Sequence, residues 1–341
     1  MLNIFKSLNS NNQIIVKNFS YLTLMKVFNI GVKVILAAYL IRILGSEKYG
    51  LITWLDSVIQ YFIMIVNFGF NIYAAKYIVE NKNKKTKINE IVSSIFIIKG
   101  VLFMLSLICV FLLGSFETFS TYKTFLLLLM FSGIGEVLFP VWFFQGIENL
   151  KPATFIVFLT RLFLLIGTVI FVNSQYNLMA YILLFVSSSI LMGFSGIFYL
   201  FKYNNIKITI LPINKLVDYF KEALPFFIGR FLSLVFNSGT IFFIGKFCLL
   251  EQVAGFDTGL KIVMLGVIPF EMLQQAVFPT ISRTKNKSML KKIVYAALII
   301  GVLVGFITYL FSDNLMFLFG GDEMLEYSSV LKFLSLLSPF V

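Results

Sequence analysis

The chain has 341 residues, of which 59% are hydrophobic and only 13% are charged. Because a soluble domain carries about 25% charged residues, this composition excludes an ordinary soluble protein. The net charge of +12 does not indicate a nucleic-acid partner, since the basic residues are spread over short loops between apolar segments. The chain contains no histidine, which excludes imidazole metal ligands and histidine-dependent catalytic pairs. We therefore expect no metal, no cofactor and no enzymatic activity.

Ten hydrophobic segments follow one another along the chain, and a helix needs about 20 mostly apolar residues to cross a bilayer. The segments cover roughly residues 19–44, 51–73, 88–113, 124–145, 153–172, 178–201, 219–247, 255–281, 289–311 and 328–341. This pattern predicts an all-α polytopic membrane protein with about ten spans. The tenth segment is shorter than the others, so we expect the second half of the bundle to be truncated.

The loops between these segments alternate in charge. One set of loops holds seventeen lysines and arginines, whereas the other set holds four. Cytoplasmic loops carry the excess of basic residues, so the first set, which includes residues 74–87, 202–218 and 282–292, is predicted to be cytoplasmic. The N-terminus belongs to the same set. Residues 312–326, with four acids and no base, form the last predicted outer loop.

The longest polar connection, residues 202–221, divides the chain into two parts. Residues 1–201 form a predicted N-terminal lobe with six spans, and residues 222–341 form an incomplete C-terminal lobe with about four. The turn at residues 45–50 has a counterpart at residues 250–255, and an offset of about 205 residues between halves is typical of transporters built from parallel repeats. The alternative is that any two membrane hairpins resemble each other.

The first segment carries two lysines at membrane depth. Lys26, Asn29 and Lys33 are three and four residues apart, so they share one face of a helix. A lysine at the bilayer centre costs on the order of 2.5–3.5 kcal/mol, and such a residue is functional by default. We therefore expect this face to line a watery or anion-containing interior. The alternative is snorkelling, which is easier for Lys26, about 10 Å into the segment, than for Lys33.

Further charged residues lie inside the predicted spans. Lys33 and three more cations fall near mid-depth on four helices, against one mid-depth acid, Glu136. Unpaired cations are unfavourable at low dielectric, so the count predicts a hydrated cavity with an anionic ligand, and phosphate is the usual partner of Arg and Lys. The residues predicted to bind this ligand are Lys26, Lys33, Lys99, Arg161, Arg230 and Lys261.

Some of these residues also have structural explanations. Asp257 and Lys261 are four residues apart on one helix face, which favours an ion pair. For Glu136, a packing pair with a neighbouring lysine is an equal alternative to a functional role. Gly193 and Gly196 are predicted to be packing or turn glycines rather than part of a site.

Several short motifs resemble one family of bacterial transporters. The most specific is Pro140-Val-Trp-Phe-Phe-Gln-Gly146. The others are Arg42-Ile-Leu-Gly-Ser-Glu-Lys-Tyr-Gly50, Asn67-Phe-Gly-Phe70, Pro225-Phe-Phe227, Val253-Ala-Gly-Phe-Asp257 with Lys261, and Phe278-Pro-Thr-Ile-Ser282. Together they resemble the Wzx-type polysaccharide flippases, the O-antigen and capsule transporters of the multidrug/oligosaccharidyl-lipid/polysaccharide (MOP) superfamily. The resemblance covers the whole chain, although members of this family typically have twelve or more spans in two six-helix lobes.

The resemblance implies a function. The family moves an oligosaccharide repeat unit, linked to undecaprenyl pyrophosphate, from the cytoplasmic to the periplasmic leaflet of the bacterial cytoplasmic membrane. The pyrophosphate would bind the lysines and arginines of a central cavity between two lobes that rock in alternating access. Asp56, Glu136 and Asp257 are candidates for coupling to an ion gradient. Besides this substrate and the membrane lipids, the expected partners are a polysaccharide polymerase and a chain-length regulator.

Two alternatives remain. A cation-coupled drug exporter of the same superfamily would line its cavity with acids and aromatic residues, whereas the mid-depth charge here is mainly basic. A membrane polysaccharide polymerase would need a large outer loop with Arg and polar groups, whereas the longest predicted outer loop is residues 312–326. Neighbouring glycosyltransferase genes would decide between these classes.

The charge pattern generates a prediction about topology. Reporter fusions at Asn83 and Lys287 should read as cytoplasmic and fusions at Thr118 and Asp322 as periplasmic, because basic loops stay on the cytoplasmic side. Paired alkaline phosphatase and green fluorescent protein fusions measure both outcomes. A periplasmic reading at Asn83 would reverse the whole orientation.

Overall fold

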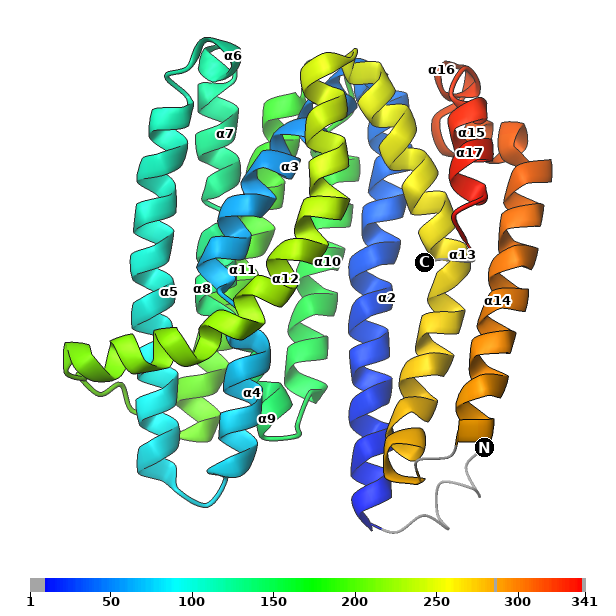
Figure 1. Ribbon diagram of the computed structural model, residues 1–341. Coiled ribbons are helices and arrows are strands. Elements are labelled where there is room, and N and C mark those ends of the chain that lie inside the picture. Colours follow the sequence, from blue (N-terminus) through cyan, green and yellow to red (C-terminus); the bar gives the residue numbers. More distant parts are fainter. Residues whose placement is uncertain (1–9, 285–286, 339–341) are drawn as a thin grey trace. The chain divides into compact units, whose positions relative to one another are not determined.

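The computed structural model describes residues 10–284 and 287–338, and every regular element within them is a helix (Figure 1). The helices form two compact units. The first unit contains the described residues up to Thr53 together with those from Ile244 onward, and the second unit contains Trp54–Phe243. The all-α architecture confirms the predicted fold class.

Within the described residues, six helical segments are long and apolar enough to cross a membrane. They are Ser20–Leu44, Ser46–Glu80, Lys85–Leu113, Lys123–Gly146, Lys151–Phe171 and Leu178–Asn204. The bent pair Val294–Leu310 and Ser312–Gly320 makes a seventh if it counts as one span. These segments correspond to predicted segments one to six and nine, so the protein is a multi-pass membrane protein.

The second unit consists of most of α3, all of α4 to α11 and most of α12. Their bounds are α3 Ser46–Asn67, α4 Phe70–Glu80, α5 Lys85–Leu113, α6 Glu117–Ser120, α7 Lys123–Met130, α8 Gly133–Leu138, α9 Val141–Gly146, α10 Lys151–Phe171, α11 Leu178–Asn204 and α12 Ile213–Phe247. Within this unit, α11 packs against α10, α7 and α8, and α4 packs against α9. Apolar side chains remain exposed along α5, as expected of a lipid-facing helix: Val101, Met104, Leu105, Ile108 and Phe111.

Two of the spans are broken along their length. The second span passes from α3 to α4 through Phe68 and Gly69, whose φ angles are +40° and +73°. Glycine suits this position because φ is positive and because a Cβ atom would lie 2.7 Å from the amide nitrogen of Phe227. The fourth span is divided into α7, α8 and α9. The last break follows Leu138, because Pro140 has no amide hydrogen with which to continue the helix.

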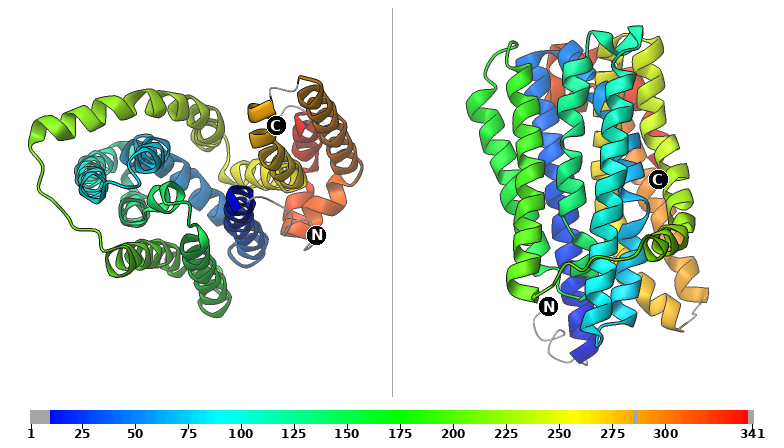
Figure 2. Two further views of the ribbon diagram at one scale, coloured as in Figure 1. Left: turned by 90° about the horizontal axis from the view of Figure 1, so that it is seen from below. Right: turned by 90° about the vertical axis from the view of Figure 1, so that its left-hand side faces the viewer.

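Pro225 lies inside α12 and accounts for the change in direction of this helix. The first turns of α12 cross α4 and α5, and the later turns rise past α3 (Figure 1). Seen from below, α12 curves around α4 and α5 (Figure 2). The indole nitrogen of Trp54 donates to the carbonyl oxygen of Phe242 at 3.2 Å, which ties the later part of α12 to α3.

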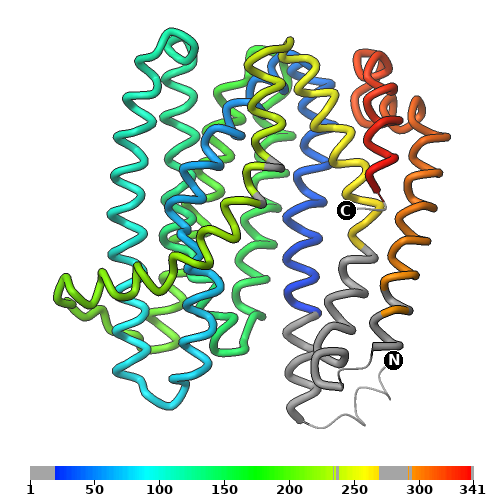
Figure 3. The backbone as a smooth tube through the Cα atoms, viewed as in Figure 1, coloured from blue at the N-terminus to red at the C-terminus, as the bar shows by residue number. Residues whose placement is uncertain are grey.

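The first unit is discontinuous in sequence. It contains α2 (Ser10–Leu44), α13 (Leu250–Thr284), α14 (Lys287–Leu310), α15 (Ser312–Gly320), α16 (Asp322–Leu325) and α17 (Ser328–Ser335), with the first turns of α3 and the last turn of α12. Within this unit, α2 packs against α13 and α15, and α17 packs against α13 and α14. The axes of α14 and α15 differ by 74° (Figure 3).

Residues 312–326, predicted as an outer loop, are helical, and the side of the membrane on which they lie stays a prediction. The residues form α15 and α16. The side chains of Met316 and Met324 are fully buried, and Asp313 lies in the first turn of α15, where a carboxylate favours a helix. The four acids make the segment polar in composition, although Met316 and Met324 pack in the interior of the unit.

Other predicted boundaries are only partly tested. α12 and α13 have 35 residues each and match the seventh and eighth segments. Within the described residues, neither helix is among the segments that are long and apolar enough to cross a membrane, so their passage through it stays a prediction. The described part of the tenth segment contains the eight-residue α17. The lobes at residues 1–201 and 222–341 also stay a prediction.

Glycines allow close contact between α8 and α11. A Cβ atom on Gly135 would overlap the main-chain carbonyl of Ser189, and one on Gly193 would lie 2.9 Å from the Cα atom of Gly135. A Cβ atom on Gly196 would lie 2.6 Å from the ring of Phe139. Such small residues let membrane helices approach closely. The packing role predicted for Gly193 and Gly196 is confirmed.

This contact predicts the effect of one methyl group. Gly135→Ala should lower the melting temperature of the purified protein, because overpacking costs about 1–3 kcal/mol. Gly100→Ala in α5 is the matched control, since nothing lies within 4 Å of its added Cβ atom. The measurement is size-exclusion chromatography of detergent-solubilised protein after heating. Equal melting of both variants would count against close packing of α8 on α11.

Candidate functional site

The lysines of α2 lie on one face of a continuous helix. Lys26, Asn29 and Lys33 keep the predicted spacing, because α2 is unbroken. The candidate span Ser20–Leu44 has 25 residues, so Lys33 is one residue from its midpoint. Lys33 is exposed and Lys26 is half-buried. Lys33 lies about 16 Å from the end of the helix at Leu44, which is farther than a lysine side chain reaches.

Two further cations occupy the centres of their helices. Lys99 is the central residue of α5, and Arg161 is the central residue of α10. Glu136, on α8, lies close to the middle of the fourth span. Each group thus lies near the middle of its apolar helical segment, and its depth in the membrane stays a prediction.

Lys99 is enclosed by the helices of the second unit. It is 1% exposed, and its ammonium group donates a hydrogen bond of 2.7 Å to the main-chain carbonyl oxygen of Glu136. In an uninterrupted helix this carbonyl would accept the amide hydrogen of residue 140. Residue 140 is proline, which has no amide hydrogen. Lys99 thus satisfies a carbonyl that the sequence leaves without a helical partner.

The carboxylate of Glu136 joins the same helices to α3. The side-chain amide of Asn67, the last residue of α3, donates to Oε2 of Glu136 at 3.2 Å. Lys99 and Arg161 both interact electrostatically with this carboxylate. The alternative of a packing role for Glu136 is therefore supported. Asn67 and Glu136 also connect the broken second span to the broken fourth span.

The remaining predicted residues of this unit lie outside that cluster. Arg230 is exposed on α12. Asp56, on α3, accepts a hydrogen bond of 3.2 Å from the side-chain amide of Gln60 one turn away. The common cavity predicted for the lysines and arginines stays a prediction.

Asp257 and Lys261 form the predicted ion pair on α13. Tyr49, in the first turn of α3, donates to Oδ2 of Asp257 at 2.5 Å and accepts from Nζ of Lys261 at 2.6 Å. Asp257 is 7% exposed, so pairing and hydrogen bonding are what allow its charge to be buried. The adjacent Gly50 packs so closely that an added Cβ atom would overlap the carbonyl of Leu250.

Side chains of the first unit also fix the turn between α2 and α3. Arg42 donates to the carbonyl oxygen of Leu318 at 2.7 Å, near the C-terminal end of α15. A cation is favourable there, because the last carbonyls of a helix have no helical partner. The amide of Ser46 donates to a carboxylate oxygen of Glu323 at 2.9 Å. The motif at residues 42–50 is therefore a packing motif.

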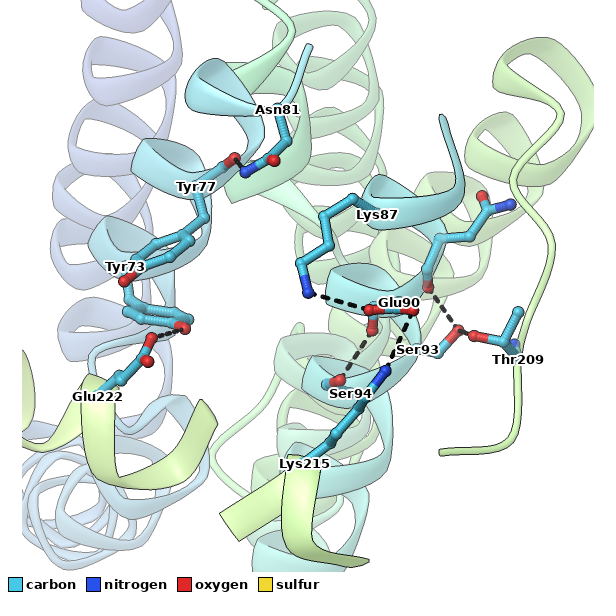
Figure 4. Close-up of polar contacts among 11 residues, drawn as sticks. Tyr73, Tyr77, Asn81, Lys87, Glu90, Ser93, Ser94, Thr209, Lys215 and Glu222 are labelled. Carbon is cyan, nitrogen blue, oxygen red and sulfur yellow. Dashed lines mark hydrogen bonds and ion pairs between the residues drawn. The ribbon is translucent and has the colours of Figure 1, made fainter. Parts of the chain in front are cut away.

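A second polar cluster, which sequence analysis missed, lies where α4, α5 and the start of α12 meet (Figure 4). The hydroxyl of Tyr73 donates to Oε2 of Glu222 at 2.7 Å. Glu90 accepts from Lys87 at 3.0 Å and from Lys215 at 3.3 Å. A pocket of about 280 Å³ is lined by Tyr77, Lys87, Lys215, Asp218, Tyr219 and Glu222.

The available sequence signal for this cluster was helical spacing. Tyr73 and Tyr77 are four residues apart, and Tyr219 and Glu222 are three apart, so each pair shares a helix face. A pattern of charge in the middle of apolar segments does not single out these residues, because they lie near the ends of their helices. The sequence does not single out Tyr49 either, because it lies among the polar residues of the turn at residues 45–50.

The fold is that of known membrane transporters. It aligns with an inward-facing multidrug resistance MATE family transporter of the MOP superfamily, with a TM-score of 0.70 and 16% identity, over 93% of this chain and 78% of that protein. It aligns with a MATE structure in the bent conformation, with a TM-score of 0.60 and 16% identity, over 97% of this chain and 80% of that protein. The architecture defines a protein of the MATE transporter fold.

Sequence comparison identifies the family. A family model described as "Polysaccharide biosynthesis protein" matches residues 15–285. A relative from Escherichia coli (strain K12), named "Putative O-antigen transporter", is 23% identical over 292 residues, or 84% of this chain and 69% of that protein. One of the same name from Shigella dysenteriae is 25% identical over 283 residues, or 82% and 71%. The chain belongs to the polysaccharide biosynthesis protein family, which confirms the resemblance seen in its motifs.

The buried pair on α13 predicts a coupled effect on stability. Lys261→Met should destabilise the protein by about 3 kcal/mol, because it leaves the Asp257 carboxylate buried without a counter-charge. The double variant with Asp257→Leu should recover part of this loss, since it removes both charges. Heating curves of the purified protein measure the effect.

Lys246→Met is the matched control for this pair, because Lys246 is exposed at the end of α12. It should melt within a degree or two of the unmodified protein, as surface substitutions change stability by about 0.5 kcal/mol or less. A double variant that melts no higher than Lys261→Met would contradict the pair.

Proposed function

We propose that this chain is a flippase for lipid-linked oligosaccharides in the bacterial cytoplasmic membrane, with its N-terminus in the cytoplasm. Family membership, the names of the two relatives and the transporter fold support this proposal. The substrate would be an oligosaccharide repeat unit linked to undecaprenyl pyrophosphate. A polysaccharide polymerase and a chain-length regulator are the proposed protein partners.

The observation that carries the substrate class is the position of cations at the centres of apolar helices. A lysine or arginine at this depth is costly unless it meets a partner or water. Lys99 is 1% exposed and Lys261 holds an ion pair with Asp257, so both serve the structure. A pyrophosphate group offers several acceptor oxygens to cations that it can reach. The proposal assigns this group to Lys26, Lys33, Arg161 and Arg230, whose side chains are exposed or half-buried.

Transport would follow alternating access. The cations would face first one leaflet and then the other as two lobes rock, while the lipid tail stays in the bilayer and the glycan crosses a hydrated interior. Asp56, Glu136 and Asp257 are the proposed acids for coupling to an ion gradient. Because Glu136 and Asp257 already hold structural hydrogen bonds, a coupling role would require these bonds to change during the cycle.

The function is tested in a strain that lacks its own transporter. Lys33→Ala and Arg230→Ala should each lower surface polysaccharide about tenfold at unchanged protein level, because a hydrogen bond to a charged group contributes roughly 1.5–3 kcal/mol. Immunoblots and polysaccharide gels measure protein and product. Normal polymer from both variants would remove the main support for the anion site.

Lys82→Ala is the matched control. Lys82 forms an exposed ion pair of 2.8 Å with Glu148, and such a pair contributes about 1 kcal/mol or less. Its polymer output should stay normal. Ethidium efflux, measured in the same strains, tests the drug exporter alternative: efflux that depends on this chain while polysaccharide does not would replace the flippase proposal.

A further inference from the structure

The pocket between α4, α5 and α12 lies at the end of the second unit that carries the basic connections at residues 81–84 and 202–212. Its volume of about 280 Å³ is close to the lower limit of small-ligand pockets, roughly 300–1,000 Å³. The first turns of α12 form one wall, and the end of α4 and the start of α5 form the others (Figure 4). Residues of three helices thus converge on a space suited to one small ring.

Aromatic rings form part of the lining. Tyr77 and Tyr219 line the pocket, and Tyr73 supports them from behind. The ring centroids of Tyr73 and Tyr77 are 4.5 Å apart, and the rings of Tyr73 and Tyr219 meet edge to face at 6.3 Å. A tyrosine offers an apolar face with a polar tip. Sugar rings present the matching surface, a face of C–H groups with hydroxyls at its edge.

The charged groups of the lining have both signs. Lys87 and Lys215 bring two ammonium groups, which are held in place by Glu90. Asp218 and Glu222 bring two carboxylates. A phosphate would face the carboxylates, and an organic cation would face the ammonium groups. A neutral polyol suits both, because each hydroxyl donates one hydrogen bond and accepts others.

One buried hydroxyl at the pocket also calls for a partner. Tyr219 is 8% exposed, and within the described residues its hydroxyl oxygen makes no well-formed hydrogen bond, although it interacts electrostatically with the ammonium group of Lys87. Leaving a buried polar group unsatisfied costs about 1–3 kcal/mol. A ligand hydroxyl in the adjoining pocket would remove this cost.

We propose that this pocket binds one sugar ring of the transported glycan, on the side predicted to be cytoplasmic. This inference rests on the proposed function and adds a carbohydrate site that is separate from the cations of α2 and α10. Glu222 and Asp218 accept hydrogen bonds from sugar hydroxyls, Lys87 and Lys215 donate to them, and the ring of Tyr77 packs against the sugar face. The phosphate and the sugar would thus be recognised by different residues.

The test is saturation-transfer NMR with the full chain in detergent. The ligands are the methyl glycosides of glucose, galactose, N-acetylglucosamine and rhamnose, with tetraphenylphosphonium and inorganic phosphate as competitors. At least one glycoside should bind, and neither ion should displace it. Glu222→Gln, Asp218→Asn and Tyr77→Leu should each weaken binding about tenfold, since each removes a charge-assisted acceptor or the stacking ring.

Glu80→Gln is the matched control, because Glu80 lies on α4 in an exposed pair with Lys76. Its glycoside affinity should be unchanged. The inference is overturned if no glycoside binds, or if glycoside binding is the same in all three pocket variants. It is also overturned if the three variants weaken the binding of tetraphenylphosphonium or phosphate instead. Failure here with loss of polysaccharide in Lys33→Ala leaves the flippase proposal standing. Glycoside binding with normal polysaccharide in Lys33→Ala and Arg230→Ala instead refutes the anion site alone.

Discussion

The hydrogen bond from the ammonium group of Lys99 to the carbonyl oxygen of Glu136 is the constraint on which the second unit depends. Hydrocarbon offers no water to an exposed carbonyl, so a helix can break at membrane depth only where the protein supplies a partner. Pro140 causes such a break, and Lys99 supplies the partner from the centre of α5. Asn67, at the break in the second span, donates a hydrogen bond to the carboxylate of Glu136. The two spans can therefore be irregular without leaving the bilayer.

The turn between α2 and α3 shows a second use of the same principle. Arg42 donates a hydrogen bond to a main-chain carbonyl near the end of α15, and Glu323 accepts one from the amide of Ser46. Tyr49 donates a hydrogen bond to Asp257 of the ion pair on α13. These contacts hold the start of the chain to helices that come much later in the sequence. Charge inside this protein thus serves structure at several positions, and the proposed anion site draws on cations of α2, α10 and α12.

Much of the fold could be predicted because hydropathy alone defines long apolar helices. The predicted segments 88–113 and 153–172 differ from α5 and α10 by at most three residues at either end. The ion pair of Asp257 and Lys261 was equally accessible, because both residues lie on one helix and one turn apart. Local periodicity is sufficient in these cases, since every group involved belongs to a single element.

Contacts between elements could not be predicted in this way. Pro140 is visible in the sequence, but nothing there reveals that Lys99, on another helix, satisfies the carbonyl it frees. The acids of residues 312–326 favour a loop over the two helices that form there. The tyrosine-lined pocket forms only where three helices meet. The missing information in each case is which side chain reaches which main-chain group or neighbouring helix. A single sequence does not contain that pairing in any periodic form.

The discontinuity of the first unit has a consequence for biosynthesis. α2 leaves the ribosome first, whereas its partners α13 and α15 begin only after 205 and 267 further residues. At roughly 5–20 residues per second, α2 waits about 10–50 s for these partners. During that interval the face of α2 that carries Leu36, Leu40 and Ile41, which is buried in the finished unit, must be covered by the insertion machinery or by lipid. The yield of inserted protein should therefore respond to the sequence of α2 before any step of transport begins.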